Sequence, residues 1–209
     1  LVADGSTHIL GACGAGALLA CRPVIAPDHG AAHQTVQAIP EGVRQLAAMQ
    51  TVSLALLENG DIWSWGFNHQ GQLGRLAQPA QNPAAIVGGL PAIASLVCGS
   101  AHALVLDESG GVWSWGANQA GQLGDGTLKS SGLPARVELP ESIASIAAGD
   151  THSMALDNTG QLWAWGSNNH GQAGSADSAY FTRPVRIQTG FPVLRIDGGQ
   201  FYTVALSEQ

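Results

Sequence analysis

The sequence predicts an all-β propeller whose blades are four-stranded sheets, and three observations point to it. A segment with two tryptophans recurs every fifty residues, around Trp63, Trp113 and Trp163. Each copy holds short runs of β-forming residues bounded by turn residues, without the 3.6-residue hydrophobic period of a helix. One sheet per unit of about fifty residues is the size of a propeller blade.

The repeat has two parts. The tryptophan segments read WSWGFNHQGQLG at 63–74, WSWGANQAGQLG at 113–124 and WAWGSNNHGQAG at 163–174. A second block precedes each of them, reading LAAMQTVSLALLENGDI at 46–62, LVCGSAHALVLDESGGV at 96–112 and IAAGDTHSMALDNTGQL at 146–162. This second block begins once more at Ile196.

The repeat divides one propeller domain into five units. A degenerate first blade covers 1–45, where Leu19 and Cys21 stand at the two tryptophan positions. Whole blades cover 46–95, 96–145 and 146–195, and a partial blade covers 196–209. We therefore expect about four whole blades and an incomplete fifth.

The third regular unit illustrates how each blade is expected to form. Short strands are predicted at 145–148 and 152–156, and the turn at 157–160 ends in Gly160, which can adopt a positive φ. A third strand is predicted at 161–165, followed by a loop. The segment 184–187 supplies an outer strand, because proline is tolerated at a sheet edge.

A single blade of this size cannot bury both of its faces, so it must stack against neighbours. We expect the repeated tryptophans to fill the contacts between blades and the repeated loop glycines to shape tight loops. These structural residues are Trp63, Trp65, Trp113, Trp115, Trp163, Trp165, Gly71, Gly121 and Gly171.

Composition narrows the range of functions. The formal net charge is −7, and Lys129 is the single lysine beside seven scattered arginines, so direct nucleic-acid binding is disfavoured. No window approaches 18 consecutive apolar residues, so no membrane span is expected. Three cysteines, Cys13, Cys21 and Cys98, form neither a disulfide framework nor a zinc motif and are interpreted as small buried residues.

The pattern W-x-W-G-x-N-x-x-G-Q-L-G, following A-G-x-x-H-S-x-A-L, resembles the regulator of chromosome condensation repeat family. The resemblance is strong over 46–174 and weak over 1–45. Members of that family form seven-bladed propellers, which implies that this chain is part of such a ring. They include a nuclear guanine-nucleotide exchange factor, ubiquitin-ligase modules, bacterial effectors and a secreted β-lactamase inhibitory protein, so the fold does not decide the function.

The sequence departs from that family pattern in having too few repeats for seven blades, no tryptophans in its first unit and only two strands in its last. We interpret the chain as a piece of a longer propeller. The alternative is that its partial ends join, within a small ring or across two chains. Open propeller edges favour self-association.

The chemistry-bearing residues are interpreted as structural. His8, His102 and His152 share a position that holds Val52 and Tyr202 in other units, so we predict no catalytic role there. His29 and His33 lie four apart but in a loop-like context, and no metal site is predicted. No catalytic residue, metal or cofactor is assigned.

Function in repeat scaffolds is expected where the repeats differ, at 75–83, 127–133 and 175–181. The candidate partner-binding residues are Tyr180, Phe181, Arg75, Lys129 and Arg183. The leading hypothesis is a non-enzymatic scaffold that binds another protein through loops on one propeller face. The alternatives are a guanine-nucleotide exchange factor for a small GTPase, a propeller-type enzyme inhibitor and, less favoured, a hydrolase or lyase.

The sequence is compatible with both a cytoplasmic and a secreted protein. Few lysines with abundant alanine and glycine favour a bacterial coding bias.

Overall fold

The computed structural model describes residues 2–5, 8–12, 18–21, 40–76, 82–140, 142–174 and 178–207. Side chains are described from residue 40 onwards. Every regular element in these segments is a β-strand, as the sequence predicts. Within them, no helix has the length and apolar character needed to cross a membrane.

In the described segments, the strands form five antiparallel sheets, in each of which consecutive strands pair. The first sheet contains β1 (Val2–Gly5), β2 (His8–Ala12) and β3 (Leu18–Cys21). The second contains β4 (Val43–Ala48), β5 (Val52–Leu57), β6 (Ile62–Gly66) and β7 (Asn82–Ile86). The third contains β8 (Ile93–Cys98), β9 (His102–Asp107), β10 (Val112–Gly116) and β11 (Ser131–Arg136).

The last two sheets continue this order. The fourth contains β12 (Ile143–Ala148), β13 (His152–Asp157), β14 (Leu162–Ser167) and β15 (Tyr180–Ile187). The fifth contains β16 (Arg195–Gly198) and β17 (Thr203–Leu206). The three central sheets therefore have the four-stranded blade form that the repeat predicts.

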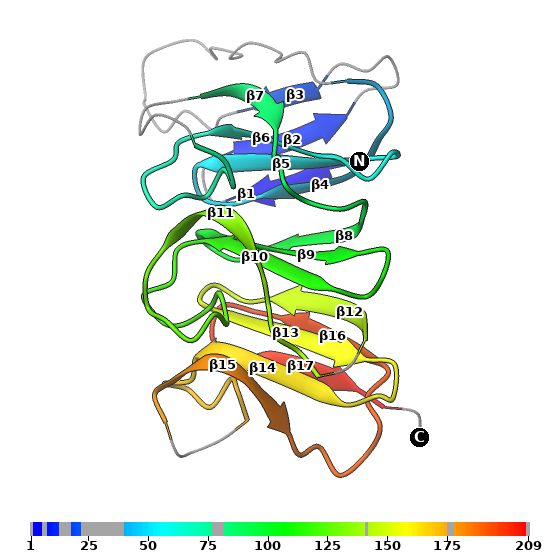
Figure 1. The fold of residues 1–209 in the computed structure, drawn as a ribbon, viewed down its shortest axis with the longest axis vertical. Coiled ribbons are helices and arrows are strands. Elements are labelled where there is room, and N and C mark those ends of the chain that lie inside the picture. The colour runs from blue at the N-terminus through cyan, green and yellow to red at the C-terminus, as the bar shows by residue number, and fades with distance from the viewer. Residues whose placement is uncertain are drawn as a thin grey trace.

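The second, third and fourth sheets follow one another along the longest axis of the molecule, and the first and fifth sheets lie at the level of the second and fourth (Figure 1). The first strands of successive sheets contact one another, β1 with β4, β4 with β8, β8 with β12 and β12 with β16. They form the inner wall of the stack, where Ala47, Val97, Cys98 and Ala148 line a hollow. Burial raises the pKa of the Cys98 thiol there.

The second, third and fourth sheets begin at Val43, Ile93 and Ile143, three residues before the unit boundaries at 46, 96 and 146. Val43 pairs with Leu57 and Ile143 with Asp157, beyond a shift of register in the first strand. Such an irregularity inserts an unpaired residue and bends the strand. The repeated block therefore starts inside the first strand and not at its beginning.

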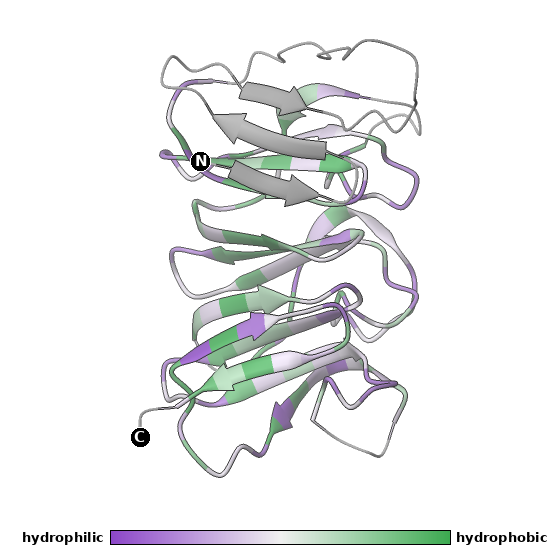
Figure 2. Cartoon of the chain, turned by 180° about the vertical axis from the view of Figure 1, so that it is seen from behind, coloured by the Kyte–Doolittle hydropathy of each residue, from purple (hydrophilic) through white to green (hydrophobic). Residues whose placement is uncertain are grey.

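Successive side chains along a strand point to opposite faces of the sheet, so each sheet contributes to a core cluster on either side. Val105 and Trp115 pack toward the second sheet, in a cluster with Leu54 and Leu96. Leu104, Leu106 and Val112 point the other way, into a cluster with Trp165. Hydrophobic residues accordingly follow the strands and hydrophilic ones gather in the connections (Figure 2).

The six tryptophans fall into two classes. The second tryptophan of each pair is buried, with exposed fractions of 6% for Trp65, 0% for Trp115 and 0% for Trp165. The first tryptophan of each pair is half-buried. Trp113 and Trp163 pack at the margin of clusters that join two sheets, whereas the cluster beside Trp63 contains residues of its own sheet. In the third and fourth sheets, the tryptophans therefore lie in the contacts between blades.

Candidate partner-binding face

The variable stretches lie on one side of the stack. In an antiparallel meander, the connection after the first strand and the connection after the third strand leave the same end of the sheet. Residues 75–76, 82–83, 127–133 and 178–181 follow the third strands of their sheets or open the fourth. The remainder, 77–81 and 175–177, lies outside the described residues.

A repeated asparagine holds this connection in the third and fourth sheets. Asn118 Nδ2 donates to the carbonyl oxygens of Thr127 and Lys129, both at 3.1 Å, while its Oδ1 accepts from Leu123 N at 2.9 Å. Asn168 repeats this with Ser178 O at 2.7 Å and Ala173 N at 2.9 Å. The recurring amide thus satisfies backbone groups of the loop, as recurrence in every unit predicts.

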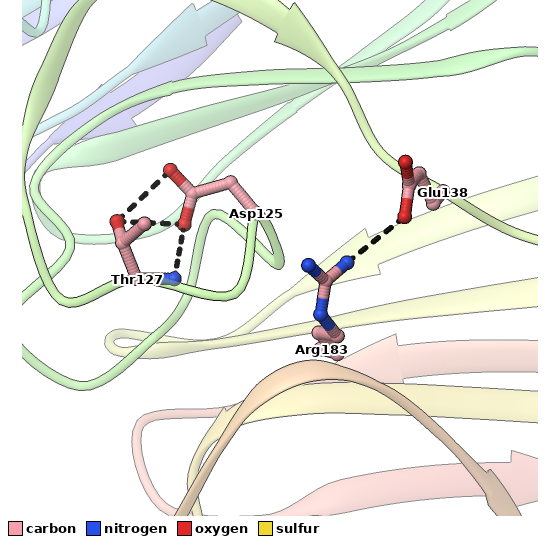
Figure 3. Close-up of polar contacts among 4 residues, drawn as sticks. All are labelled: Asp125, Thr127, Glu138 and Arg183. Atoms are coloured by element: carbon pink, nitrogen blue, oxygen red, sulfur yellow. Dashed lines mark hydrogen bonds and ion pairs between the residues drawn. The ribbon is translucent and has the colours of Figure 1, made fainter.

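The loop of the third sheet is further stiffened at its tip. Asp125 Oδ1 accepts from Thr127 N at 2.8 Å and from Thr127 Oγ1 at 2.9 Å (Figure 3). Gly126 N donates to Thr182 O at 2.8 Å, which ties the tip to β15 of the next sheet. The loop therefore presents its outer residues on a fixed backbone.

Two of the repeated glycines allow each loop to approach the following sheet. A Cβ on Gly71 would lie 2.5 Å from the Cα of Gly132 in β11. A Cβ on Gly121 would lie 2.8 Å from Phe181 O in β15. Gly171 meets nothing within 4 Å, because it lies in the last loop of this kind that the structure describes.

The predicted partner-binding residues separate into internal and surface groups. Arg75 is half-buried, and its guanidinium donates to Ser64 Oγ at 3.1 Å, Ser64 O at 3.2 Å and Pro83 O at 2.7 Å. It therefore closes its own loop against β6 and β7. Phe181 is also half-buried and packs against the clusters on both faces of the fourth sheet.

Lys129, Tyr180 and Arg183 lie at the surface. The side chain of Arg183 is 60% exposed, and its Nη1 lies 2.9 Å from Glu138 Oε2 (Figure 3). The guanidinium also rests on Gly126, where an added Cβ would lie 2.8 Å from Nη2. These contacts bring the loop of the third sheet and the outer strand of the fourth together.

Sequence reasoning missed three members of this surface. Leu128 and Leu133 are exposed apolar residues, at 42% and 51%, and Glu138 supplies the carboxylate opposite Arg183. The two leucines stand inside the stretch 127–133 already marked as variable, so their apolar character in a polar loop was the available signal.

The side chain at the shared histidine position contacts the next sheet. His102 Nε2 lies 2.9 Å from Ser153 Oγ, and Ser153 Oγ donates to Gln122 O at 2.8 Å. Since the hydroxyl hydrogen is used on that carbonyl, the ring nitrogen must be the donor to Ser153. His152 contacts Thr203 Oγ1 at 3.2 Å in the same way.

Other candidate chemistry has structural partners as well. Ser100 Oγ donates to Asp150 O at 2.8 Å, which joins the turns of adjacent sheets. Asp107 and Asp157 accept bonds from the turn that follows them and from the indoles of Trp113 and Trp163.

Within the described residues, no group of three His, Cys, Asp or Glu side chains could hold a metal ion. His29, His33 and Cys13 lie outside the described residues, and the side chains of His8 and Cys21 are likewise not described.

Family comparison agrees with this architecture. The family model of the regulator of chromosome condensation (RCC1) repeat matches residues 59–106, 109–156 and 159–206, more than half of the chain. This chain belongs to the RCC1 repeat family. Each RCC1 repeat runs from the third strand of one sheet to the second strand of the next, so every repeat spans two neighbouring blades.

Solved structures show the same fold. Human WBSCR16 superposes with a TM-score of 0.84 at 19% identity, covering 98% of this chain and 58% of that one. Yeast RCC1 (Prp20) bound to Kap60 gives 0.82 at 22%, with coverages of 99% and 53%. Prp20p from Saccharomyces cerevisiae gives 0.80 at 22%, with 98% and 55%. The RCC1-repeat chain thus spans a little over half the length of these propellers.

Proposed function

We propose that this RCC1-repeat chain is a non-enzymatic scaffold that binds a partner protein through the loops following the third strands of its sheets. The observation that carries the proposal is the surface where the loop 125–130 meets β15. Its backbone is held by Asn118 and by the Gly126 N to Thr182 O bond, yet its outer side chains are exposed. A fixed backbone with exposed side chains limits the entropy lost on binding.

The exposed residues have the character of a binding surface. Leu128, Leu133 and Tyr180 are exposed and wholly or partly apolar, and Lys129 and Arg183 are exposed as well. Interfaces typically combine aromatic or aliphatic anchors with a polar rim, and tyrosine and arginine are frequent in their energetic centres. Tyr180 and Arg183 are therefore the proposed anchors.

The likeness to solved structures supports a protein partner. Two of these structures are of Prp20: one holds it bound to Kap60, and the other is described with its binding properties to Gsp1p and histones. An acidic chain with net charge −7 is compatible with a basic partner. Guanine-nucleotide exchange on a small GTPase and occlusion of an enzyme are the alternatives within the same scaffold class.

The experiment is affinity capture from the lysate of the natural host, followed by measurement of the dissociation constant for the captured protein. The double variant Tyr180→Ala/Arg183→Ala should bind about tenfold or more weakly, the typical effect of losing two anchors. Glu108→Ala changes an exposed residue in a turn at the opposite end of the sheets and is the matched control. Equal binding by all three proteins would reject this face.

Two further measurements separate the alternatives. Accelerated nucleotide release from the captured protein would assign exchange activity, and inhibition of a captured enzyme would assign the inhibitor role. Turnover of a small substrate with no protein partner would reject the scaffold proposal.

A further inference from the structure

The outermost strands of the third and fourth sheets carry a charge opposite in sign to the rest of the molecule. Segments 125–138 and 180–187, here called the outer wall, hold four exposed cations and two anions, a formal net charge of +2. The cations are Lys129, Arg136, Arg183 and Arg186, and the anions are Asp125 and Glu138. The other side chains described from residue 40 onwards include three Lys or Arg and eight Asp or Glu, a net charge of −5. Both sheets have four strands, and each contacts a sheet on either side.

Contacts between the two sheets make the outer wall one surface. Gly126 N, at the tip of the loop before β11, donates to Thr182 O in β15 at 2.8 Å. Arg183 Nη1 lies 2.9 Å from Glu138 Oε2, in the segment that follows β11. Arg183 therefore lies between the loop tip and that segment (Figure 3). A ligand that binds Arg183 meets both sheets.

Most of the positive charge on the outer wall is not neutralised by the protein itself. Arg183–Glu138 is the only ion pair in the part of the chain that the structure describes, and both of its side chains are exposed. The Asp125 carboxylate is engaged by its own loop, where Oδ1 accepts from Thr127 N and Thr127 Oγ1. The remaining cations have no carboxylate partner among the described residues: Lys129, Arg136 and Arg186.

The strands β11 and β15 favour recognition by side chains over the addition of a strand. Each is the last strand of its sheet and, within the described chain, pairs on one side only. Pro134 and Pro184 stand in these strands and lack the N–H that an added strand would bind. Arg136 and Arg186 occupy equivalent positions, because each pairs with the first tryptophan of its sheet. A guanidinium binds a carboxylate through two parallel hydrogen bonds, so these positions suit acidic side chains.

Exposed leucines accompany the positive charge. Leu128 is 42% exposed and precedes Lys129 in the loop, and Leu133 is 51% exposed in β11. Apolar side chains of a peptide can cover these leucines while its carboxylates meet the cations. A long nucleic acid would also place phosphates against the acidic remainder of the molecule, which repels a polyanion. A short acidic segment with apolar side chains is therefore the ligand that fits the wall.

We propose that the partner bound at this face contributes an acidic segment, whose carboxylates pair with the arginines of the outer wall and whose apolar side chains cover Leu128 and Leu133. This inference rests on the proposed scaffold function and names the chemistry of the partner. The net charge of −7 is compatible with a basic partner, but exposed charges farther away than about 8 Å are largely screened at physiological ionic strength. The charge of the wall itself therefore selects the ligand. Glu138 illustrates the binding mode, because it already places a carboxylate on Arg183.

Labelled peptides of equal length test the charge of the ligand, one with repeats of Glu-Glu-Leu, one of Gln-Gln-Leu and one of Lys-Lys-Leu. Fluorescence anisotropy should show saturable binding of the acidic peptide to the chain, and this binding should weaken as salt is added. The neutral and basic peptides should bind at least about tenfold more weakly, since they lack hydrogen bonds between charged groups. Equal binding of all the peptides, or no binding of the acidic one, overturns the proposal. Tighter binding of oligothymidylate than of the acidic peptide at the same salt concentration assigns the wall to nucleic acid and also overturns it.

Variants of the protein locate the site, provided that each keeps the wild-type circular dichroism spectrum. Arg186→Glu should weaken binding of the acidic peptide about tenfold. Arg44→Glu changes the net charge equally at an exposed position of β4 and should leave the affinity nearly unchanged. Glu138→Gln removes the competing carboxylate from Arg183 and should strengthen binding by up to about fivefold, the scale of an exposed ion pair. A folding defect would weaken binding instead. Equal affinities of the Arg186→Glu and Arg44→Glu proteins would contradict the proposal.

The captured partner separates this inference from the scaffold proposal. Weaker binding of that partner to both Tyr180→Ala/Arg183→Ala and Arg186→Glu supports both. Weaker binding to Tyr180→Ala/Arg183→Ala alone overturns the acidic segment and leaves the scaffold proposal standing. Unchanged binding to both variants rejects the face and, with it, the acidic segment.

Discussion

Trp165 and Gln122 form a hydrogen bond across a blade boundary, with the indole Nε1 donating to the main-chain oxygen at 2.9 Å. Trp115 makes the same bond to Gln72 O one blade earlier, also at 2.9 Å. The indole is fully buried at both positions. A buried N–H requires an acceptor, so each tryptophan joins its own blade to the loop of the blade before it.

Trp165→Ala is expected to lower the free energy of unfolding by about 3–5 kcal/mol, since it leaves a cavity between two sheets and removes a buried hydrogen bond. Urea denaturation followed by circular dichroism measures the loss. Trp163→Ala is the control within the same strand, and a smaller loss is expected because Trp163 is only half-buried. Equal losses would show that burial between blades does not distinguish the two tryptophans.

Much of this arrangement could be predicted from the sequence. The recurrence of two tryptophans and their flanking strands was sufficient to predict four-stranded blades with tryptophan between them. The acceptor of Trp165 could not be predicted, because it is a main-chain oxygen 43 residues away, and residue type says nothing about where a carbonyl points. Alignment of the repeats shows which residues occupy equivalent positions. Which atoms meet between two blades depends on how one blade is rotated relative to the next.

The same limit explains why the candidate surface was predicted only in part. Arg75 and Arg183 both stand in or beside variable stretches, and the sequence does not distinguish them. The structure shows Arg75 bonded to Ser64 and Pro83, and Arg183 largely exposed beside Glu138. A guanidinium reaches several ångströms, so its role depends on which carbonyls the loop brings within range.

Arg75→Ala should therefore destabilise the chain by about 1–3 kcal/mol, because two carbonyl oxygens and one hydroxyl lose a donor. Arg183→Ala should change stability by less than about 1 kcal/mol, since its ion pair is exposed to solvent. Thermal and urea denaturation of both variants, run in parallel, give the comparison. A larger loss for Arg183→Ala would contradict the assignment of Arg75 as the internal residue.

The His102–Ser153 contact should behave as a unit. Ser153→Ala removes the acceptor of the His102 ring and one donor to Gln122 O, for an expected loss of about 1–3 kcal/mol. One blade boundary earlier, the equivalent positions are apolar: Val52 corresponds to His102 and Ala103 to Ser153, and both lie in one buried cluster. The double variant His102→Val/Ser153→Ala reproduces this apolar pair. Its free energy of unfolding should fall by less than the sum of the losses for the two single variants.

A double-mutant cycle from urea denaturation measures that coupling. The expected coupling energy is at least about 0.5 kcal/mol, as found for residues in one hydrogen-bond network. Strict additivity would mean that the two side chains do not stabilise each other.

Asp157 should be a stabilising residue of its turn. Its Oδ1 accepts from Thr159 N and Gln161 N, and its Oδ2 accepts from Trp163 Nε1 at 3.1 Å. Asp157→Ala is expected to cost about 2–3 kcal/mol, within the range for hydrogen bonds to a charged group. Glu108→Ala, an exposed turn carboxylate, should stay within about 0.5 kcal/mol in the same denaturation assay. Equal losses for Asp157→Ala and Glu108→Ala would show that the hydrogen bonds of Asp157 do not stabilise the chain.

The buried histidines make stability depend on pH in a defined direction. Burial, with a smaller contribution from nearby His152, lowers the pKa of His102 from 6.5 to about 3. Between those values the unfolded state binds the additional proton, so the stabilisation is complete above pH 6.5 and decreases as the pH falls toward 3. The slope reaches about 1.4 kcal/mol per pH unit for each such group.

Asp107 and Asp157 respond in a separate window. Burial alone would raise their pKa values, but hydrogen bonds from Ser109 and Trp113, and from Thr159 and Trp163, lower both below 3.8. Their stabilisation is present above pH 3.8 and is lost as the pH falls through the lowered values. Between pH 6.5 and pH 3.8, the loss should therefore come from the histidines and not from these two carboxylates.

Urea midpoints measured from about pH 7.5 to about pH 4.5 test this assignment, since histidine is the side chain that ordinarily titrates there. The double variant His102→Val/Ser153→Ala should lose less stability over that interval than the wild type. Asp157→Ala should keep the wild-type dependence there and differ from it only at lower pH. A wild-type slope in the His102→Val/Ser153→Ala protein would show that other groups carry the acid sensitivity, because the valine introduced in that protein binds no proton.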